Sequence, residues 1–160
     1  MSTPPLQLIR QLKLQEGEPG GLPALKAYWD PIGQVFTAGY GQTGQGIGPN
    51  TICTPAQADT WLLASVERFT LQLDSRLPWA VQMGVVRHSV FVNMEYNMGL
   101  RFQAFTETIN DAHLAIMAGA AQASDYDACA AAMLDSVWAR QVGQRAVDLA
   151  KQMRTGEWVI

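Results

Sequence analysis

Apolar residues recur at helical spacing near the start of the chain. These residues are Leu6, Leu8, Ile9 and Leu12, and among them Leu8 and Leu12 lie four residues apart, on one face of a helix. The pattern predicts a short amphipathic helix over residues 6–16 that ends by Gly17. A loop rich in proline and glycine follows over residues 19–23.

The pattern changes between residues 27 and 51. Here six glycines separate short runs of β-branched and aromatic residues. Such runs, bounded by turn residues, are typical of strands that pair with their neighbours along the chain. We therefore expect a small, turn-rich antiparallel sheet.

Beyond residue 51 the pattern is helical. Thr54 and Pro55 form a helix start, with threonine as the N-cap and proline in the first helical position, for a helix reaching about Leu73. The apolar stretch from Val81 to Met98 predicts a central helix buried on most sides and ended by Gly99. Later helices are expected at about Thr106–Ala118, Tyr126–Leu134 and Arg140–Met153.

Together these elements predict an α+β fold of two lobes in a single domain, residues 1–160. A small antiparallel sheet lobe would span about residues 16–52. A larger helical lobe would comprise about residues 1–15 and 53–160. In such an arrangement a cleft between the lobes is the natural place for a ligand.

Charge and cysteine content exclude several classes of function. The formal net charge of −3 argues against a non-specific nucleic-acid binder, which needs a cationic surface. Cys53 and Cys129 are isolated from each other and from histidine, so we expect reduced, half-buried thiols and no metal site. No organic cofactor is expected either.

The chain also lacks the sequence features of export and membrane insertion. Its N-terminus has neither the cationic start nor the apolar core of a signal peptide. No uncharged apolar run approaches the roughly 20 residues needed to span a bilayer. We expect a monomer that is synthesised in the cytoplasm and does not insert into a membrane.

Three residues in the first third of the chain are candidates for chemistry. Glu16 continues the Leu8/Leu12 spacing, which would place its carboxyl among apolar groups, where it stays protonated and can act as a general acid. Asp30 directly precedes Pro31, and Thr37 lies in a run of β-type residues before Gly39. Each has a plainer interpretation: Glu16 as a helix end, Asp30 as a turn former before proline, and Thr37 as a strand residue.

The order of these residues resembles the catalytic signature of phage-type lysozymes, the endolysins of glycoside hydrolase family 24. That signature is Glu-Gly, Leu-x-x-Tyr-x-Asp, a glycine turn and Thr-x-Gly-Tyr-Gly. The corresponding segments here are Glu16-Gly17, Leu25 to Asp30, Gly33, and Thr37 to Gly41. Similarity to the T-even phage lysozymes continues at Asn93-Met94, Tyr96 to Gly99, Phe105-Thr106, Trp138, Gln144 to Ala146, and Met153 to Trp158.

The resemblance implies a lysozyme-like fold and a set of roles. Glu16 would protonate the leaving oxygen, Asp30 would stabilise positive charge on the sugar, and Thr37 would hold the attacking water. Arg145 would support the acid, and a solvated helix charge is its plainer interpretation. Tyr96 and Thr43 would bind substrate, with core packing and a plain turn as their respective alternatives.

Three departures from the family pattern bear on these assignments. The link from Glu16 to Asp30 carries extra residues, which makes Glu18 a rival acid, and the link from Asp30 to Thr37 is one residue longer. Gln42 stands where the family usually has histidine, and we expect this change to affect sheet packing more than catalysis.

The resemblance also implies a substrate and a biological role. The partner would be the glycan strands of bacterial peptidoglycan, cleaved at the β-1,4 bond between N-acetylmuramic acid and N-acetylglucosamine. The enzyme would reach the wall in the periplasm after membrane permeabilisation and lyse the host. The alternatives are a lytic transglycosylase on the same fold and a non-catalytic peptidoglycan-binding protein.

Overall fold

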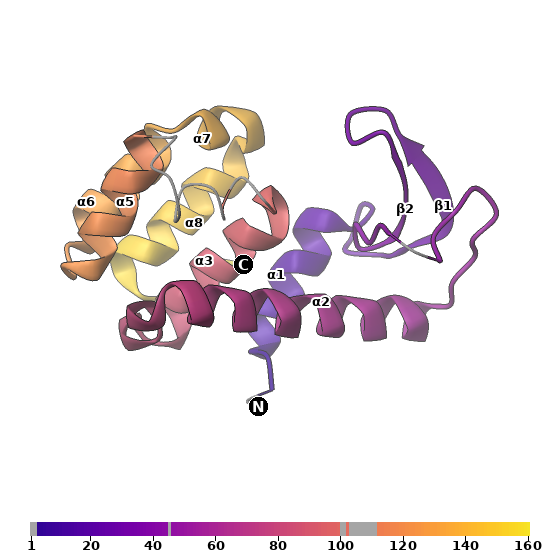
Figure 1. The fold of residues 1–160 in the computed structure, drawn as a ribbon, viewed down its shortest axis with the longest axis horizontal. Helices are drawn as coiled ribbons and strands as arrows, with labels where there is room; N and C mark the ends of the chain where they lie inside the picture. The colour runs from indigo at the N-terminus through magenta and orange to yellow at the C-terminus, as the bar shows by residue number, and fades with distance from the viewer. Residues whose placement is uncertain (1–2, 45, 100–101, 103–111) are drawn as a thin grey trace. The chain divides into compact units, whose positions relative to one another are not determined.

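The structure is a computed structural model that describes residues 3–44, 46–99, 102 and 112–160. The chain forms two compact units, Met1–Glu67 and Arg68–Ile160. Helix α2 (Pro55–Arg76) begins in the first unit and ends in the second (Figure 1). A two-stranded antiparallel sheet with a mostly helical remainder makes the fold α+β, as predicted.

The first unit begins with helix α1 (Leu6–Glu16), which has the predicted bounds. Leu8 and Leu12 are buried, as the spacing indicated, whereas Leu6, at the start of the helix, is exposed. Strands β1 (Ala24–Asp30) and β2 (Val35–Gly39) follow and pair as an antiparallel hairpin (Figure 1). The predicted sheet is therefore present, and it has two strands.

The register of the hairpin decides which side chains share a face. Tyr28 lies opposite Thr37, and Trp29 lies opposite Phe36. Because side chains alternate along a strand, Tyr28, Thr37 and Asp30 point to one face, while Trp29 and Phe36 point to the other. The two aromatic rings meet edge to face with centroids 5.0 Å apart.

Helix α2 begins as the sequence predicted. The Thr54 hydroxyl accepts a hydrogen bond from the Gln57 backbone N–H at 3.1 Å, and the Gln57 side-chain oxygen accepts one from the Thr54 N–H at 2.8 Å. This reciprocal capping box satisfies two backbone donors at the helix start. The helix ends at Arg76, three residues beyond the predicted Leu73.

The second unit corrects the prediction of one continuous helix from Val81. A 3₁₀ helix, η1 (Pro78–Met83), comes first, and α3 (Val85–Met98) follows it. Gly84 separates them with a φ of 83°, a left-handed conformation that interrupts a helix and that glycine adopts without strain. Gly99 ends α3 as predicted.

The remaining helices are α5 (Ala112–Gln122), α6 (Tyr126–Leu134), α7 (Val137–Val142) and α8 (Gln144–Thr155). Helix α6 has the predicted bounds. Helix α5 ends four residues after the predicted Ala118, while its predicted start at Thr106 lies outside the described residues. The single helix predicted over Arg140–Met153 is wrong, because Gly143, with a φ of 59°, divides that stretch into α7 and α8.

The core of the second unit forms around α3. Eight of the fourteen residues of α3 are buried, which confirms its predicted central place. Helix α8 packs against both α3 and α6, and its apolar residues Ala146, Leu149, Ala150 and Met153 are buried. Among the helices of the described residues, none is long and apolar enough to cross a membrane.

Candidate active site

Glu16 is the last residue of α1, and Gly17 lets the chain turn sharply after it. A Cβ atom on Gly17 would lie 2.5 Å from the carbonyl oxygen of Lys13 and 2.7 Å from that of Leu22. No side chain fits between these two backbone groups, so glycine is required by packing. Glu16 is partly buried, and a Cβ on Gly41 would lie 3.5 Å from its Oε2 atom, which places the carboxyl beside the turn after β2.

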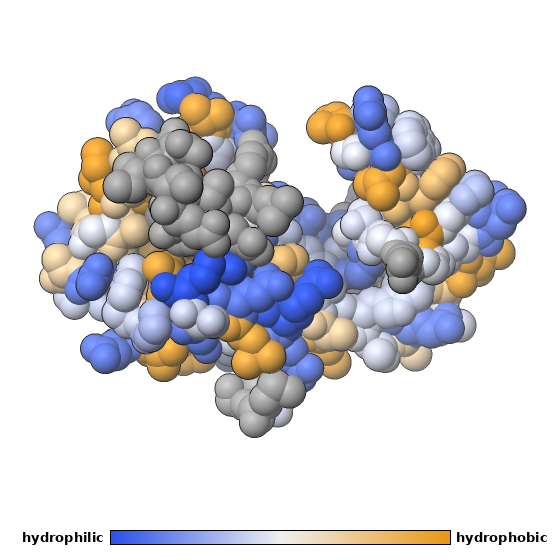
Figure 2. Space-filling view, in the orientation of Figure 1, coloured by the Kyte–Doolittle hydropathy of each residue, from blue (hydrophilic) through white to orange (hydrophobic). Residues whose placement is uncertain are grey.

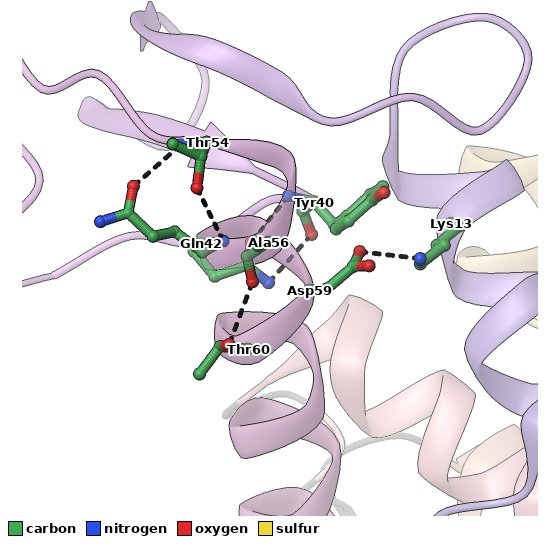
Figure 3. A network of polar contacts seen from close by, with 8 residues as sticks. Lys13, Tyr40, Gln42, Thr54, Ala56, Asp59 and Thr60 are labelled. Carbon is green, nitrogen blue, oxygen red and sulfur yellow. Dashed lines mark hydrogen bonds and ion pairs between the residues drawn. The ribbon is translucent and has the colours of Figure 1, made fainter.

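A polar network holds the end of α1 that carries Glu16 (Figure 3). The Lys13 ammonium forms an ion pair with Asp59 of α2 at 2.7 Å and lies 5.4 Å from the centroid of the buried Tyr40 ring. The hydrogen bond to Asp59 raises the pKa of Lys13, and burial raises the pKa of Tyr40. The lysine therefore stays charged and the phenol neutral, so that both contacts persist at neutral pH.

Gln42 closes the turn that contains Tyr40. Its side-chain oxygen accepts a hydrogen bond from the Tyr40 N–H at 2.6 Å, and its amide donates to the Tyr40 carbonyl at 3.4 Å (Figure 3). A Cβ on Gly39 would lie 2.5 Å from that same side-chain oxygen. Gln42 thus packs within the turn and is buried.

Asp30 ends β1 at the hairpin turn. Its Oδ1 atom accepts a hydrogen bond from the Ile32 N–H at 2.9 Å, which confirms the plainer interpretation of this residue as a turn former. Its Oδ2 atom would lie 2.8 Å from a Cβ on Gly33. The turn backbone therefore fixes the carboxylate, and such a fixed orientation also suits a catalytic group.

Thr37 lies in the middle of β2 with only 5% of its surface exposed. Its hydroxyl has no hydrogen-bond partner among the residues that the structure describes. A buried hydroxyl without a partner costs free energy unless a water or a ligand satisfies it. Thr37 is also a diagonal neighbour of Asp30 across the hairpin, a relation that typically separates Cα atoms by about 7–8 Å.

Tyr28 interacts electrostatically with the carboxylates of both Glu16 and Asp30. Burial raises the pKa of its phenol, and the charges of Asp30, Glu16 and Glu18 raise it further. Both Glu16 and Asp30 are therefore within electrostatic range of one side chain on the face that carries Thr37. Residues from the end of α1, the end of β1 and the middle of β2 thus come together in the first unit.

The rival acid Glu18 is placed differently from Glu16. Glu18 is exposed, and its backbone pairs with Leu22 in a tight turn formed by the extra residues of this link. A carboxyl in water is a weaker candidate for a general acid than one partly shielded from it, which favours Glu16. Thr43, the predicted substrate contact, is exposed just after Gln42.

Arg145 and Tyr96 lie in the second unit. Arg145, on α8, donates to the side chain of Asn93 on α3, so it is held by a polar contact and is more than a solvated charge. Tyr96, also on α3, is partly buried and meets Phe69 edge to face at 5.6 Å. This packing agrees with the alternative interpretation of Tyr96 as a core residue.

Two residues with candidate roles were not singled out from the sequence. Tyr28 shares the face of Asp30 and Thr37, which the two-residue alternation before Asp30 could have indicated. Asn93 holds Arg145, and the available signal was an amide inside the apolar run from Val90 to Met94. Such a buried amide needs a polar partner.

Comparisons with known proteins bear on the family and the fold of this chain. The sequence profile of the phage lysozyme family matches residues 20–155, a range that includes Asp30, Thr37 and Arg145 and begins four residues after Glu16. The fold is similar to that of the endolysin from Escherichia coli O157:H7 phage FAHEc1. The TM-score is 0.71 and the identity 21%, over 100% of this chain and 98% of that chain. Curated protein sequences give no significant match.

Fold and sequence together define the class of this protein as a lysozyme-type glycoside hydrolase. The chain belongs to the phage lysozyme family, whose substrate is bacterial peptidoglycan.

Proposed function

We propose that this enzyme hydrolyses the β-1,4 bond between N-acetylmuramic acid and N-acetylglucosamine, with Glu16, Asp30 and Thr37 as its catalytic residues. Glu16 donates a proton to the leaving oxygen, and Asp30 stabilises the positive charge that develops on the sugar. Thr37 holds the water that attacks the opposite face, so the anomeric configuration inverts.

The observation that carries this proposal is the Thr37 hydroxyl. It is buried, it lacks a hydrogen-bond partner among the described residues, and it shares a face of the hairpin with Asp30. A bound water would satisfy this hydroxyl and would lie near a carboxylate whose orientation is fixed by the Ile32 N–H. These are the requirements of a hydrolytic water site.

The remaining assignments follow from the family. Arg145 supports the acid, and Tyr96 and Thr43 contact the glycan. The enzyme acts as a monomer on peptidoglycan strands, reaching the wall after the membrane has been permeabilised, and it lyses the host cell.

The test is mass spectrometry of the fragments released from purified sacculi, with Glu16→Gln run in parallel. Hydrolysis leaves reducing N-acetylmuramic acid ends, which should be absent with the variant because glutamine cannot donate the proton. 1,6-Anhydro ends would instead establish a lytic transglycosylase. Binding to sacculi without release of fragments would establish a non-catalytic wall-binding protein.

A Thr37→Val variant examines the water site directly. Valine keeps the shape and removes the hydroxyl, so the fold should persist while turnover falls by about 10²-fold or more. Glu18→Gln is the matched control for the acid, because Glu18 is also close to Tyr28 but is exposed. Its turnover should stay within about twofold of that of the wild type.

A further inference from the structure

Tyr28 is not one of the three proposed catalytic residues, but the hairpin register places it beside two of them. It lies directly opposite Thr37 and two residues before Asp30. Directly paired residues of an antiparallel sheet have Cβ atoms about 4.5–5.5 Å apart, so the phenol ring stands immediately beside the proposed water site.

The exposure of Tyr28 separates it from a core residue. It is 49% exposed, whereas Thr37 beneath the same face is 5% exposed. The structure records no hydrogen bond to the phenol from any residue that it describes, and no aromatic ring contact. An aromatic side chain at the edge of a polar site therefore offers both a ring face and a hydroxyl to a ligand.

The charges around Tyr28 determine what the hydroxyl can do. Its pKa is raised above the ordinary value of 10.0 by burial and by the charges of Asp30, Glu16 and Glu18, so the phenol keeps its proton at neutral pH. A protonated phenol is a hydrogen-bond donor. Sugars combine apolar C–H faces with many hydroxyl oxygens, and a tyrosine matches both features.

We propose that Tyr28 is a substrate-binding residue, whose ring packs against a sugar of the glycan while its hydroxyl donates to a sugar oxygen. This inference rests on the proposed function, because the sugar it binds is the one held between Asp30 and Thr37. Tyr28 sets the position of that sugar relative to the water on Thr37.

Steady-state kinetics on soluble, uncross-linked glycan strands from sacculi test the assignment with Tyr28→Leu and Tyr28→Phe. Tyr28→Leu removes ring and hydroxyl and should raise KM by about five- to tenfold. Tyr28→Phe keeps the ring and should lower kcat/KM by about two- to fivefold. If Tyr28→Leu does not fold, Tyr28→Phe alone decides the question.

The matched control is Trp29→Leu. Trp29 is the next residue on β1, is 51% exposed and points to the opposite face of the hairpin, so the substitution should leave KM within about twofold of that of the wild type. Equal increases in KM for Tyr28→Leu and Trp29→Leu would assign the effect to the hairpin and overturn the inference.

Two further outcomes separate this inference from the proposed function. A wild-type enzyme that cleaves strands, with folded Tyr28 variants of unchanged KM and kcat, would overturn the role of Tyr28 alone. A wild-type enzyme that releases no fragments would overturn the proposed function, and the role of Tyr28 with it.

Discussion

The side-chain oxygen of Asn93 accepts two hydrogen bonds from Arg145, one from Nε at 3.1 Å and one from a terminal guanidinium nitrogen at 2.8 Å. Asn93 is fully buried in the middle of α3, and Arg145 lies on α8. Two donors from one side of a planar guanidinium fix its plane as well as its position. The arginine is therefore oriented by the core of the second unit.

Arg145→Ala should consequently affect stability as well as activity. The substitution takes two donors from a buried acceptor and should lower the free energy of unfolding by about 1–3 kcal/mol, measured by urea denaturation. Loss of the cation should also lower turnover if Arg145 supports the acid. The fold should remain, because the apolar face of α8 is untouched.

Arg140→Ala is the control for Arg145→Ala. Arg140 is exposed on α7, and its removal should change the free energy of unfolding by less than about 0.5 kcal/mol. Equal, small effects of the two substitutions would show that the contact with Asn93 contributes nothing to the stability of the second unit.

Gly17→Ala should destabilise the first unit and displace Glu16. The added methyl would lie within 2.5–2.7 Å of two backbone oxygens, which cannot move aside as a flexible side chain could. We expect a loss of about 2–3 kcal/mol in the free energy of unfolding, together with reduced turnover.

Gly48→Ala is the matched control for Gly17→Ala. A Cβ on Gly48 would meet no atom within 4 Å, and Gly48 has no positive φ. Its stability and activity should therefore stay close to those of the wild type. Equal losses in the two variants would contradict the packing argument for Gly17.

Gly33→Ala should separate activity from stability. The methyl would lie 2.8 Å from Oδ2 of Asp30, and the carboxylate can rotate away at little cost to the fold. The melting temperature should therefore change little, whereas turnover on sacculi should fall by about tenfold or more if the orientation of Asp30 matters. Unchanged turnover would contradict a catalytic role that depends on the orientation of the Asp30 carboxylate.

Local sequence signals predicted much of the fold. The spacing of Leu8 and Leu12 predicted α1, Gly17 marked its end, and Thr54-Pro55 marked the start of α2. The apolar pattern did not predict the helix breaks at Gly84 and Gly143, because it continues across both glycines. In the structure the backbone of each glycine has a positive φ, which interrupts the helix. A glycine permits that conformation without requiring it, so the sequence cannot show where it occurs.

The candidate site was harder to predict from the sequence than the helix and strands that carry its residues. Glu16, Asp30 and Thr37 could be named from their order, but the register that places Tyr28 opposite Thr37 is a property of strand pairing. A register shift between Ala24 and Tyr28 changes which residues of β1 share a face. The contact between Asn93 and Arg145 joins residues 52 positions apart, which no local pattern reveals.

Cys129 should make the protein sensitive to alkali. Burial raises the pKa of this thiol to about 12, from an ordinary value of 9.0. Between these values the folded state keeps a proton that the unfolded state has lost. The free energy of unfolding therefore falls as pH rises, by up to about 1.4 kcal/mol per pH unit, and the thiol's full contribution is present only below pH 9.

Comparing Cys129→Ala with the wild type isolates this effect. The raised pKa values of Lys13, Tyr28 and Tyr40 also weaken the fold at high pH, but they are common to both proteins and cancel in the difference. Urea denaturation with a reductant present, at pH 8 and pH 10, should show the wild type losing about 1 kcal/mol more than the variant. Equal losses would mean that the thiol has the same pKa in the folded and unfolded states, and that its burial on α6 does not raise this pKa.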